Sequence, residues 1–304
     1  MRDTINSGLT SRPYQHRQAA EKESIRRMKM GQRIKLIAII VACTLGDIVL
    51  HLVTSAYSTM PVNPNYSIVA KSFGMEVTVS LWALLSFSGA AYVYGRIRDR
   101  IPGEGVKKGL RYGAGIALLW LFAMLEGVSL FGNPIINEFV VGLCDAIPVF
   151  IMGILLSLLK VESGERDAAA KPFSFGQKLA AVAIFAGVFL LGRYAAYFLG
   201  VIQSGYQTSP VYTWIWTLLM GACMGAVYIL LGNAADSWCL GRSAAKFGLL
   251  IFGVNWATFL LFMPFVFSGY LTDVLARIMI DTLLVTIGYY LACGLKIARK
   301  PTLH

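Results

Sequence analysis

The chain has 304 residues, of which 57% are apolar and only 14% are charged. Soluble globular domains carry about 25% charged residues, so this composition excludes an ordinary soluble protein and predicts one that lies in a lipid bilayer. The formal net charge is +11, but the basic residues are scattered between apolar runs and form no single patch, so we expect no nucleic-acid partner.

Eight apolar segments follow one another along the chain. Each has the roughly 20 residues that an α-helix needs to cross the hydrocarbon of a membrane. The strands of a membrane barrel would alternate in hydrophobicity, and these segments do not. We therefore predict an all-α polytopic membrane protein with eight transmembrane helices, over residues 35–56, 76–95, 110–131, 138–159, 178–200, 211–232, 245–268 and 274–297.

The lysine and arginine residues fall mainly on one side of the predicted membrane. Nine lie from Arg2 to Lys35, six lie between 96 and 111, and most others lie in later connections on the same side. Only Lys71 and Arg277 fall on the opposite side, and Arg193 lies inside the fifth segment. The positive-inside rule then places both termini in the cytoplasm. We expect an integral protein of the cytoplasmic (inner) membrane of a prokaryote.

The second half of the chain aligns on the first after a shift of 136 residues. The motif GAxY at 89–92 then falls on GAxY at 225–228, Trp120 on Trp256 and Asp145 on Asp281. With a different offset, Gly46-Asp47 can be set against Gly192-Arg193, so that an acid in one half would face a base in the other. Two parallel four-helix repeats are predicted, because an even number of helices returns the chain to its starting side.

This repeat divides the chain into five parts. They are a basic cytoplasmic N-terminal tail (1–34), a first four-helix repeat (35–160), a cytoplasmic linker (161–177), a second four-helix repeat (178–297) and a cytoplasmic C-terminal tail (298–304). The basic tail could form a helix against an anionic membrane surface, or it could be a solvated segment that only sets the topology. Both forms remain open at this point.

Polar side chains inside the apolar segments are the main clue to function. Ionisable groups near the bilayer centre are costly and usually face the protein interior or water. Seven such residues fall in the outer half of the predicted membrane or near its midplane: Asp47, His51, Glu126, Asp145, Arg193, Asn255 and Asp281. We predict that they form one substrate- or ion-binding site, and we assign no catalytic residue, no metal ligand and no cofactor.

Structural explanations also exist for the individual residues. Arg193 could neutralise one of the acids, Asp281 could pair with Arg277, and Asn255 could form a hydrogen bond between helices. The set is more informative than its members, because its four carboxylates outnumber the available cations.

Three functions are consistent with this pattern, and we favour the first. It is a transporter or permease for a small cationic or zwitterionic solute, with proton coupling through the intramembrane carboxylates. The second is a non-catalytic subunit or scaffold that has a protein partner. The third is a membrane enzyme that uses His51 and nearby acids to bind a metal or to act as acid and base, although the chain has no HExxH, GxSxG or GxxxxGK[ST] motif.

Overall fold

The computed structural model describes residues 11–58, 64–159, 173–235 and 239–298, and this part of the chain is helical apart from its connections. The predicted all-α membrane fold is confirmed. Eight helical spans are long and apolar enough to cross a membrane, and they cover residues 30–53, 75–100, 106–131, 135–158, 175–198, 210–235, 240–266 and 271–294. Most of the predicted linker, up to residue 172, lies outside the described residues.

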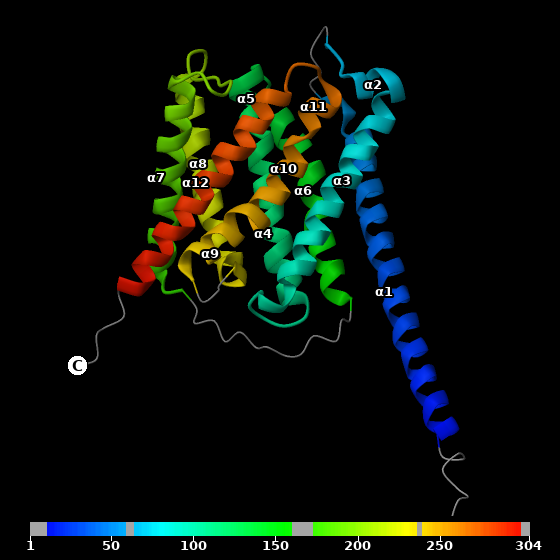
Figure 1. Cartoon of the computed structure of the whole chain (residues 1–304). Helices are drawn as coiled ribbons and strands as arrows, with labels where there is room; N and C mark the ends of the chain where they lie inside the picture. Colours follow the sequence, from blue (N-terminus) through cyan, green and yellow to red (C-terminus); the bar gives the residue numbers. More distant parts are fainter. Residues whose placement is uncertain (1–10, 59–63, 160–172, 236–238, 299–304) are drawn as a thin grey trace, which may run out of the picture.

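The first four spans begin with a helix that is longer than a membrane span. Helix α1 runs over Ser11–Val53, so part of the basic tail continues the first span as one helix that extends away from the bundle (Figure 1). After the short turns η1 (Ser55–Tyr57) and α2 (Ile68–Phe73) come the remaining spans of this half. They are formed by α3 (Met75–Ile97) with η2 (Arg98–Arg100), α4 (Val106–Met124) with α5 (Glu126–Phe131), and α6 (Ile135–Leu158).

The last four spans lie in the second half of the chain. Helices α7 (Phe175–Phe198) and α8 (Pro210–Leu231) form two of them, with η3 (Gly232–Ala235) at the end of α8. The seventh span is built from α9 (Leu240–Ala245), the π-helical segment η4 (Lys246–Gly253), α10 (Val254–Leu260) and α11 (Phe262–Val266). Helix α12 (Leu271–Ala298) forms the eighth. Helix α1 begins and α12 ends on the same side of the bundle (Figure 1).

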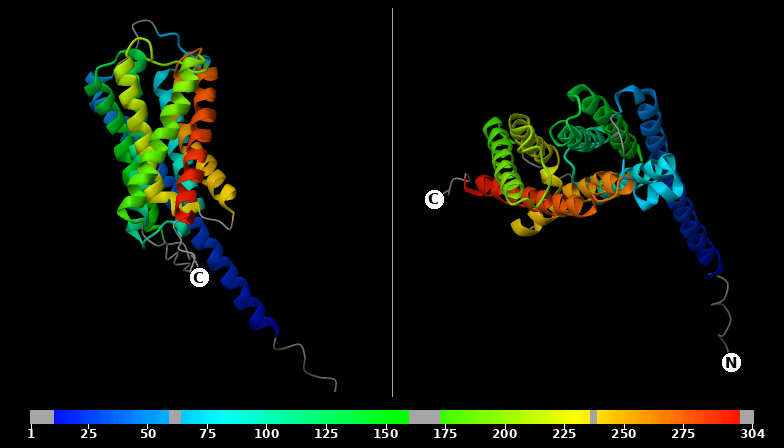
Figure 2. Two further views of the ribbon diagram at one scale, coloured as in Figure 1. Left: turned by 90° about the vertical axis from the view of Figure 1, so that its left-hand side faces the viewer. Right: turned by 90° about the horizontal axis from the view of Figure 1, so that it is seen from above.

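The eight spans form a closed ring of neighbours. Helix α1 packs between α3 and α6, α6 packs on α4, α4 on α8, α8 on α7, and α7 on α12. The ring closes because α12 packs on η4 and α10, and α10 packs on α3. Seen from above, this gives an elongated bundle with α7 and α1 at its two ends (Figure 2). A residue on α1 is therefore separated from α7 by most of the length of the bundle.

Two spans are interrupted at corresponding places. Helix α4 ends and α5 begins on either side of Leu125, while α10 ends and α11 begins on either side of Leu261, 136 residues later. The fourth span begins at Ile135 and the eighth span at Leu271, which are also 136 residues apart. In both halves the interruption lies near the end of the span that faces away from the chain termini.

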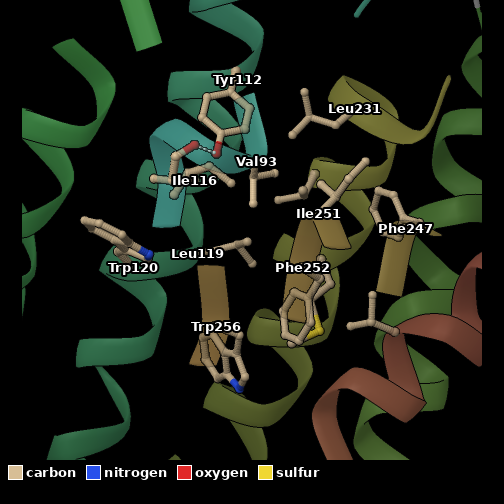
Figure 3. Close-up of a cluster of buried hydrophobic side chains, with 14 of the residues drawn as sticks. Val93, Tyr112, Ile116, Leu119, Trp120, Leu231, Phe247, Ile251, Phe252 and Trp256 are labelled. Atoms are coloured by element: carbon tan, nitrogen blue, oxygen red, sulfur yellow. Dashed lines mark hydrogen bonds between the residues drawn. The ribbon is translucent and has the colours of Figure 1, made fainter. Parts of the chain in front are cut away.

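The interior between the two halves is filled by apolar side chains. They come from α3, α4, α8, η4 and α10, and each is at most 1% exposed. Figure 3 shows the central group, which consists of Val93, Tyr112, Ile116, Leu119, Trp120, Leu231, Phe247, Ile251, Phe252 and Trp256. Such dense packing leaves little room for charged side chains at the centre of the bundle.

Glycine allows a close contact between the backbones of α4 and α6. A Cβ atom added at Gly113 would lie 2.5 Å from the carbonyl oxygen of Phe150, and one added at Gly153 would lie 2.7 Å from the Cα atom of Gly113. Since lipid tails are as apolar as leucine, helices in a membrane associate largely by such close backbone packing. This contact holds α6, which carries Asp145, against the centre of the bundle.

The contact predicts that Gly113→Ala destabilises the protein. The added methyl group forces the helices apart, and overpacking of this kind costs about 1–3 kcal/mol. Thermal unfolding of the purified protein in detergent measures the loss. Gly187→Ala in α7 is the matched control, because a Cβ atom there meets nothing within 4 Å. Equal melting temperatures for the two variants would contradict the prediction.

Candidate functional site

The seven polar residues predicted from the sequence do not meet at one place. Three of them, Asp47, His51 and Asp145, form what we call the histidine cluster, between α1 and α6. Glu126, Arg193 and Asp281 belong to a second group, the arginine cluster, which also includes Asp273 and Arg277. Helices α1 and α7 lie at opposite ends of the bundle, so the two clusters are separate (Figure 1).

The histidine cluster follows from helical spacing on α1. Asp47 and His51 are four residues apart and lie on one face of the helix, which packs against α6. Asp145 lies on α6 three residues before Pro148, inside the helix. Thr54, one turn beyond His51, approaches the sulfur of Cys144 to 3.1 Å, which fixes the register of α1 against α6.

The three side chains converge on a small volume. His51 Nε2 lies 3.1 Å from Asp145 Oδ1 and 3.8 Å from Asp47 Oδ1. Only the first of these distances is that of a hydrogen bond. The carboxylate side chains are almost fully buried, at 1% and 3% exposed, whereas the imidazole is 31% exposed. His51 is thus the member of the cluster that is most accessible from outside the bundle.

Asp47 is the unusual member of this cluster. Its two carboxylate oxygens are buried, and neither has a hydrogen-bond partner among the described residues. The hydroxyl oxygen of Thr44, on the preceding turn of α1, is buried without a partner as well. Burying an ionised carboxylate without compensation costs several kcal/mol, so Asp47 needs a proton or an external cation.

The arginine cluster, in contrast, is densely paired. Arg193 is fully buried, and its Nε and Nη2 atoms each donate a 2.6 Å hydrogen bond to one oxygen of Asp281. Its Nη1 atom donates to Glu126 at 3.0 Å and to the hydroxyl of Tyr197 at 3.3 Å. Trp256 donates its indole N–H to Asp281 at 2.9 Å. The parallel pair of bonds is the strongest geometry for a guanidinium and a carboxylate.

Arg277 extends this network toward the loop between α7 and α8. Its Nη1 atom donates to Glu126 at 2.6 Å, and its Nε atom donates to Asp273, one turn earlier on α12, at 2.5 Å. Its Nη2 atom donates to the carbonyl of Gln203, whose own N–H donates to Asp273 at 2.6 Å. The network therefore ties α5, α7, α12 and the loop after α7 together.

Aromatic rings complete the environment of Arg193. Its guanidinium carbon lies 5.2 Å from the ring centre of Phe189, 5.5 Å from that of Trp216 and 5.9 Å from that of Tyr197. These faces attract a cation and exclude water from it. In the arginine cluster each charge has opposite charges in direct contact, so the cluster is suited to holding helices together.

The pairings expected from the sequence are found only in part. Arg193 does neutralise acids, but Arg277 pairs with Glu126 and Asp273 and not with Asp281. Asp47 faces Asp145 and His51, while Arg193 lies elsewhere. Asn255 belongs to neither cluster. It donates to the carbonyl of Ile251 and accepts a 3.4 Å hydrogen bond from Tyr112, next to the π-helical segment.

Three residues that take part in polar contacts were not predicted from the sequence as site residues. Asp273 lies four residues before Arg277, and this i, i+4 spacing was a usable signal. Trp256 was noted only as part of the repeat, although its N–H binds Asp281. Glu138, which is 4% exposed, lies at the start of α6 and accepts a 2.5 Å hydrogen bond from Asn133. The sequence Asn133-Pro134 before that helix gave no indication of the contact.

The histidine cluster has the donor set of a small cation site. One imidazole nitrogen and two carboxylate oxygens lie within 4.8 Å of one another. Carboxylate oxygens attract cations in general, and an imidazole adds affinity for transition metals. Within the parts of the chain that the structure describes, no other group of three such residues is brought together.

No protein-family model, no curated protein and no solved structure matches this chain. The eight apolar helices of the described residues define its class, an all-helical membrane protein. The two clusters are the features that bear on its function.

The contrast between the clusters predicts opposite effects of neutralising one acid in each. Asp281→Asn weakens the pairing of the buried Arg193 and should lower the free energy of unfolding by about 3–5 kcal/mol. Asp47→Asn removes a buried charge without a hydrogen-bond partner, so it should leave stability unchanged or increase it. Unfolding of both variants in the same detergent provides the comparison. A loss for Asp47→Asn as large as that for Asp281→Asn would contradict this assignment.

Proposed function

We propose that the protein is a membrane transporter for a small cationic solute, and that the histidine cluster is its binding site. The observation that carries this proposal is the buried carboxylate of Asp47, which lies beside Asp145 and His51 without a hydrogen-bond partner among the described residues. Polar residues that are kept in a membrane at such a cost commonly mark the path of a substrate or ion. Glu126, Arg193 and Asp281 then have a structural role.

Charge favours a cation as the substrate. Two carboxylates face one imidazole, so the cluster has an excess of negative charge that a cation or protons must balance. An anionic solute would add to this excess. Proton coupling belongs to the proposal, because exchange of a cation for protons keeps the buried cluster near neutrality in both states.

The position of α1 supports a route at the edge of the bundle. Apolar side chains fill the centre of the bundle (Figure 3). The side chain of His51, in contrast, is 31% exposed. In the most apolar stretch of α1 only 17% of the residues are buried, against 33–61% in the other spans. A helix with so few internal contacts can shift at less cost than its neighbours, and its movement would expose the cluster to one side or the other.

We further propose that the eight spans are two copies of a four-helix unit. Moving four places around the ring of neighbours takes each span to its counterpart in the other half. The interruptions at Leu125 and Leu261 and the 136-residue offset between the first residues of the fourth and eighth spans agree with this relation. A twofold axis along the membrane normal would relate two such copies, as it does in parallel repeats.

A second candidate, a non-catalytic subunit or scaffold, is favoured by the arginine cluster. Its charges pair within the chain and tie together α5, α7 and α12, as is expected of a purely structural network. A scaffold would bind a protein partner and would move no solute. The histidine cluster distinguishes the two candidates, since a scaffold gives no reason to leave the Asp47 carboxylate without a hydrogen-bond partner among the described residues.

Transport is tested with the purified chain in proteoliposomes that contain a pH-sensitive dye. Gradients of Na⁺, Mn²⁺, Zn²⁺ and tetraethylammonium are applied in turn, and we expect flux of at least one cation together with a change in internal pH. Asp145→Asn and Asp47→Asn should reduce that flux to the rate of protein-free liposomes.

The control is Asp99→Asn, which neutralises an acid whose side chain is 56% exposed and lies outside both clusters. Flux through this variant should equal that of the unmodified chain. If none of the cations moves faster than through protein-free liposomes, the scaffold candidate is preferred.

The orientation in the membrane is a separate prediction. Most basic residues lie on the side of the bundle where α1 begins, which should place both termini in the cytoplasm. Green fluorescent protein fused after residue 304 should therefore fluoresce, and alkaline phosphatase fused there should be inactive. The reverse pair of results would invert the topology. Insertion of the same reporters in the loop 199–209 should give the opposite outcome.

A further inference from the structure

We infer that Asp47, His51 and Asp145 bind a divalent first-row transition-metal ion such as Zn²⁺. We also infer that, in the second half of the chain, the guanidinium of Arg193 occupies the place that corresponds to this ion. The inference rests on the proposed function in one respect: it identifies this metal ion as the cation that the transporter carries. The binding site itself stands on the geometry of the three side chains.

The distances suit a metal with short bonds to nitrogen and oxygen. Zn²⁺ binds imidazole nitrogen and carboxylate oxygen at about 2.0–2.2 Å, so tetrahedral ligands lie about 3.3–3.6 Å from each other. His51 Nε2 lies 3.1 Å from Asp145 Oδ1 and 3.8 Å from Asp47 Oδ1, on either side of this range. Small rotations of the side chains would bring the three donor atoms to tetrahedral spacing.

The charge and type of the ligands point to the same class of ion. Two carboxylates balance the charge of a divalent cation, and a neutral imidazole adds a nitrogen donor that Na⁺, Mg²⁺ and Ca²⁺ do not favour. Three protein ligands leave a fourth position for water or for a group that receives the ion. The partly exposed His51 provides the approach to this position.

An independent observation comes from Asp47. Its side chain is 1% exposed, it points toward His51 and Asp145, and neither oxygen has a hydrogen-bond partner in the described structure. A protonated His51 would satisfy Asp145, at hydrogen-bonding distance, and would leave Asp47 unsatisfied at 3.8 Å. A metal ion between the three groups would satisfy both carboxylates.

The second half of the chain contains a counterpart with the cation built in. Asp145 corresponds to Asp281 by the 136-residue offset, and each receives its partner from the first helix of its own half. Setting Asp47 against Arg193 also sets His51 against Tyr197. Asp281 binds the guanidinium of Arg193, which is fixed to α7. Asp145 instead faces Asp47 and His51, whose side chains are ligands for a free cation.

Metal binding is tested on the full chain, purified in detergent and treated with a chelator. Titration with ZnCl₂ followed by calorimetry, and metal analysis after desalting, should show a site that is lost in Asp47→Asn, His51→Ala and Asp145→Asn. We expect each change to weaken the affinity at least about tenfold, since even changes outside the direct ligands cost that much. Asp99→Asn is the control and should bind as the unmodified chain does.

Asp47→Arg is the decisive variant, because it copies the second half. The new guanidinium should pair with Asp145, so this variant should lose Zn²⁺ binding while melting at or above the temperature of Asp47→Asn. Such a melting temperature would show that the variant is folded and that its loss of Zn²⁺ binding is not caused by unfolding. Zn²⁺ affinity that is absent in the unmodified chain, or equal in all variants, would overturn the inference.

The outcomes also separate this inference from the proposed function. Flux of a different cation that depends on Asp145, without Zn²⁺ binding, would overturn the metal site and leave the transporter. Zn²⁺ binding that depends on the three residues, without flux of any cation, would support the metal site and remove the transporter.

Discussion

A lipid bilayer offers no water to a buried charge, and the polar residues of this protein are arranged around that constraint. The arginine cluster meets it inside the chain, because Arg193 and Arg277 are surrounded by Asp281, Glu126 and Asp273. The histidine cluster does not meet it completely, because Asp47 keeps two buried oxygens for which the described part of the chain offers no hydrogen-bond partner. This difference separates a group that stabilises the fold from one that is suited to binding.

The placement of the clusters follows from the way the helices pack. Close contact between glycines brings α4 against α6, and apolar side chains fill the space between the two halves (Figure 3). Little room is left for charged groups at the centre. The histidine cluster lies between α1 and α6, at one end of the elongated bundle, and the arginine cluster joins α7 and α12 to α5 nearer the other end (Figure 2).

A duplicated unit would explain why the two clusters resemble each other in position and differ in chemistry. In both, an aspartate in the fourth helix of a half is bound by a side chain from the first helix. Under the proposed function, a permanent internal cation would stabilise one copy, and the other copy would be free to exchange its ligand. In such a molecule the fixed half serves as a frame for the mobile half, and the sparsely packed α1 is the part most able to move.

The sequence by itself determined the membrane class and the number of spans. Lipid requires long apolar helices, so each span is visible in the local composition, and Asp47 with His51 shows its shared face through helical spacing. Which residues meet was decided only by the tertiary structure. Arg193 lies 67 residues from Glu126 and 88 from Asp281, and His51 lies 94 from Asp145. Such pairs depend on the order of helices around the ring, which local composition does not encode, and for that reason one predicted site became two.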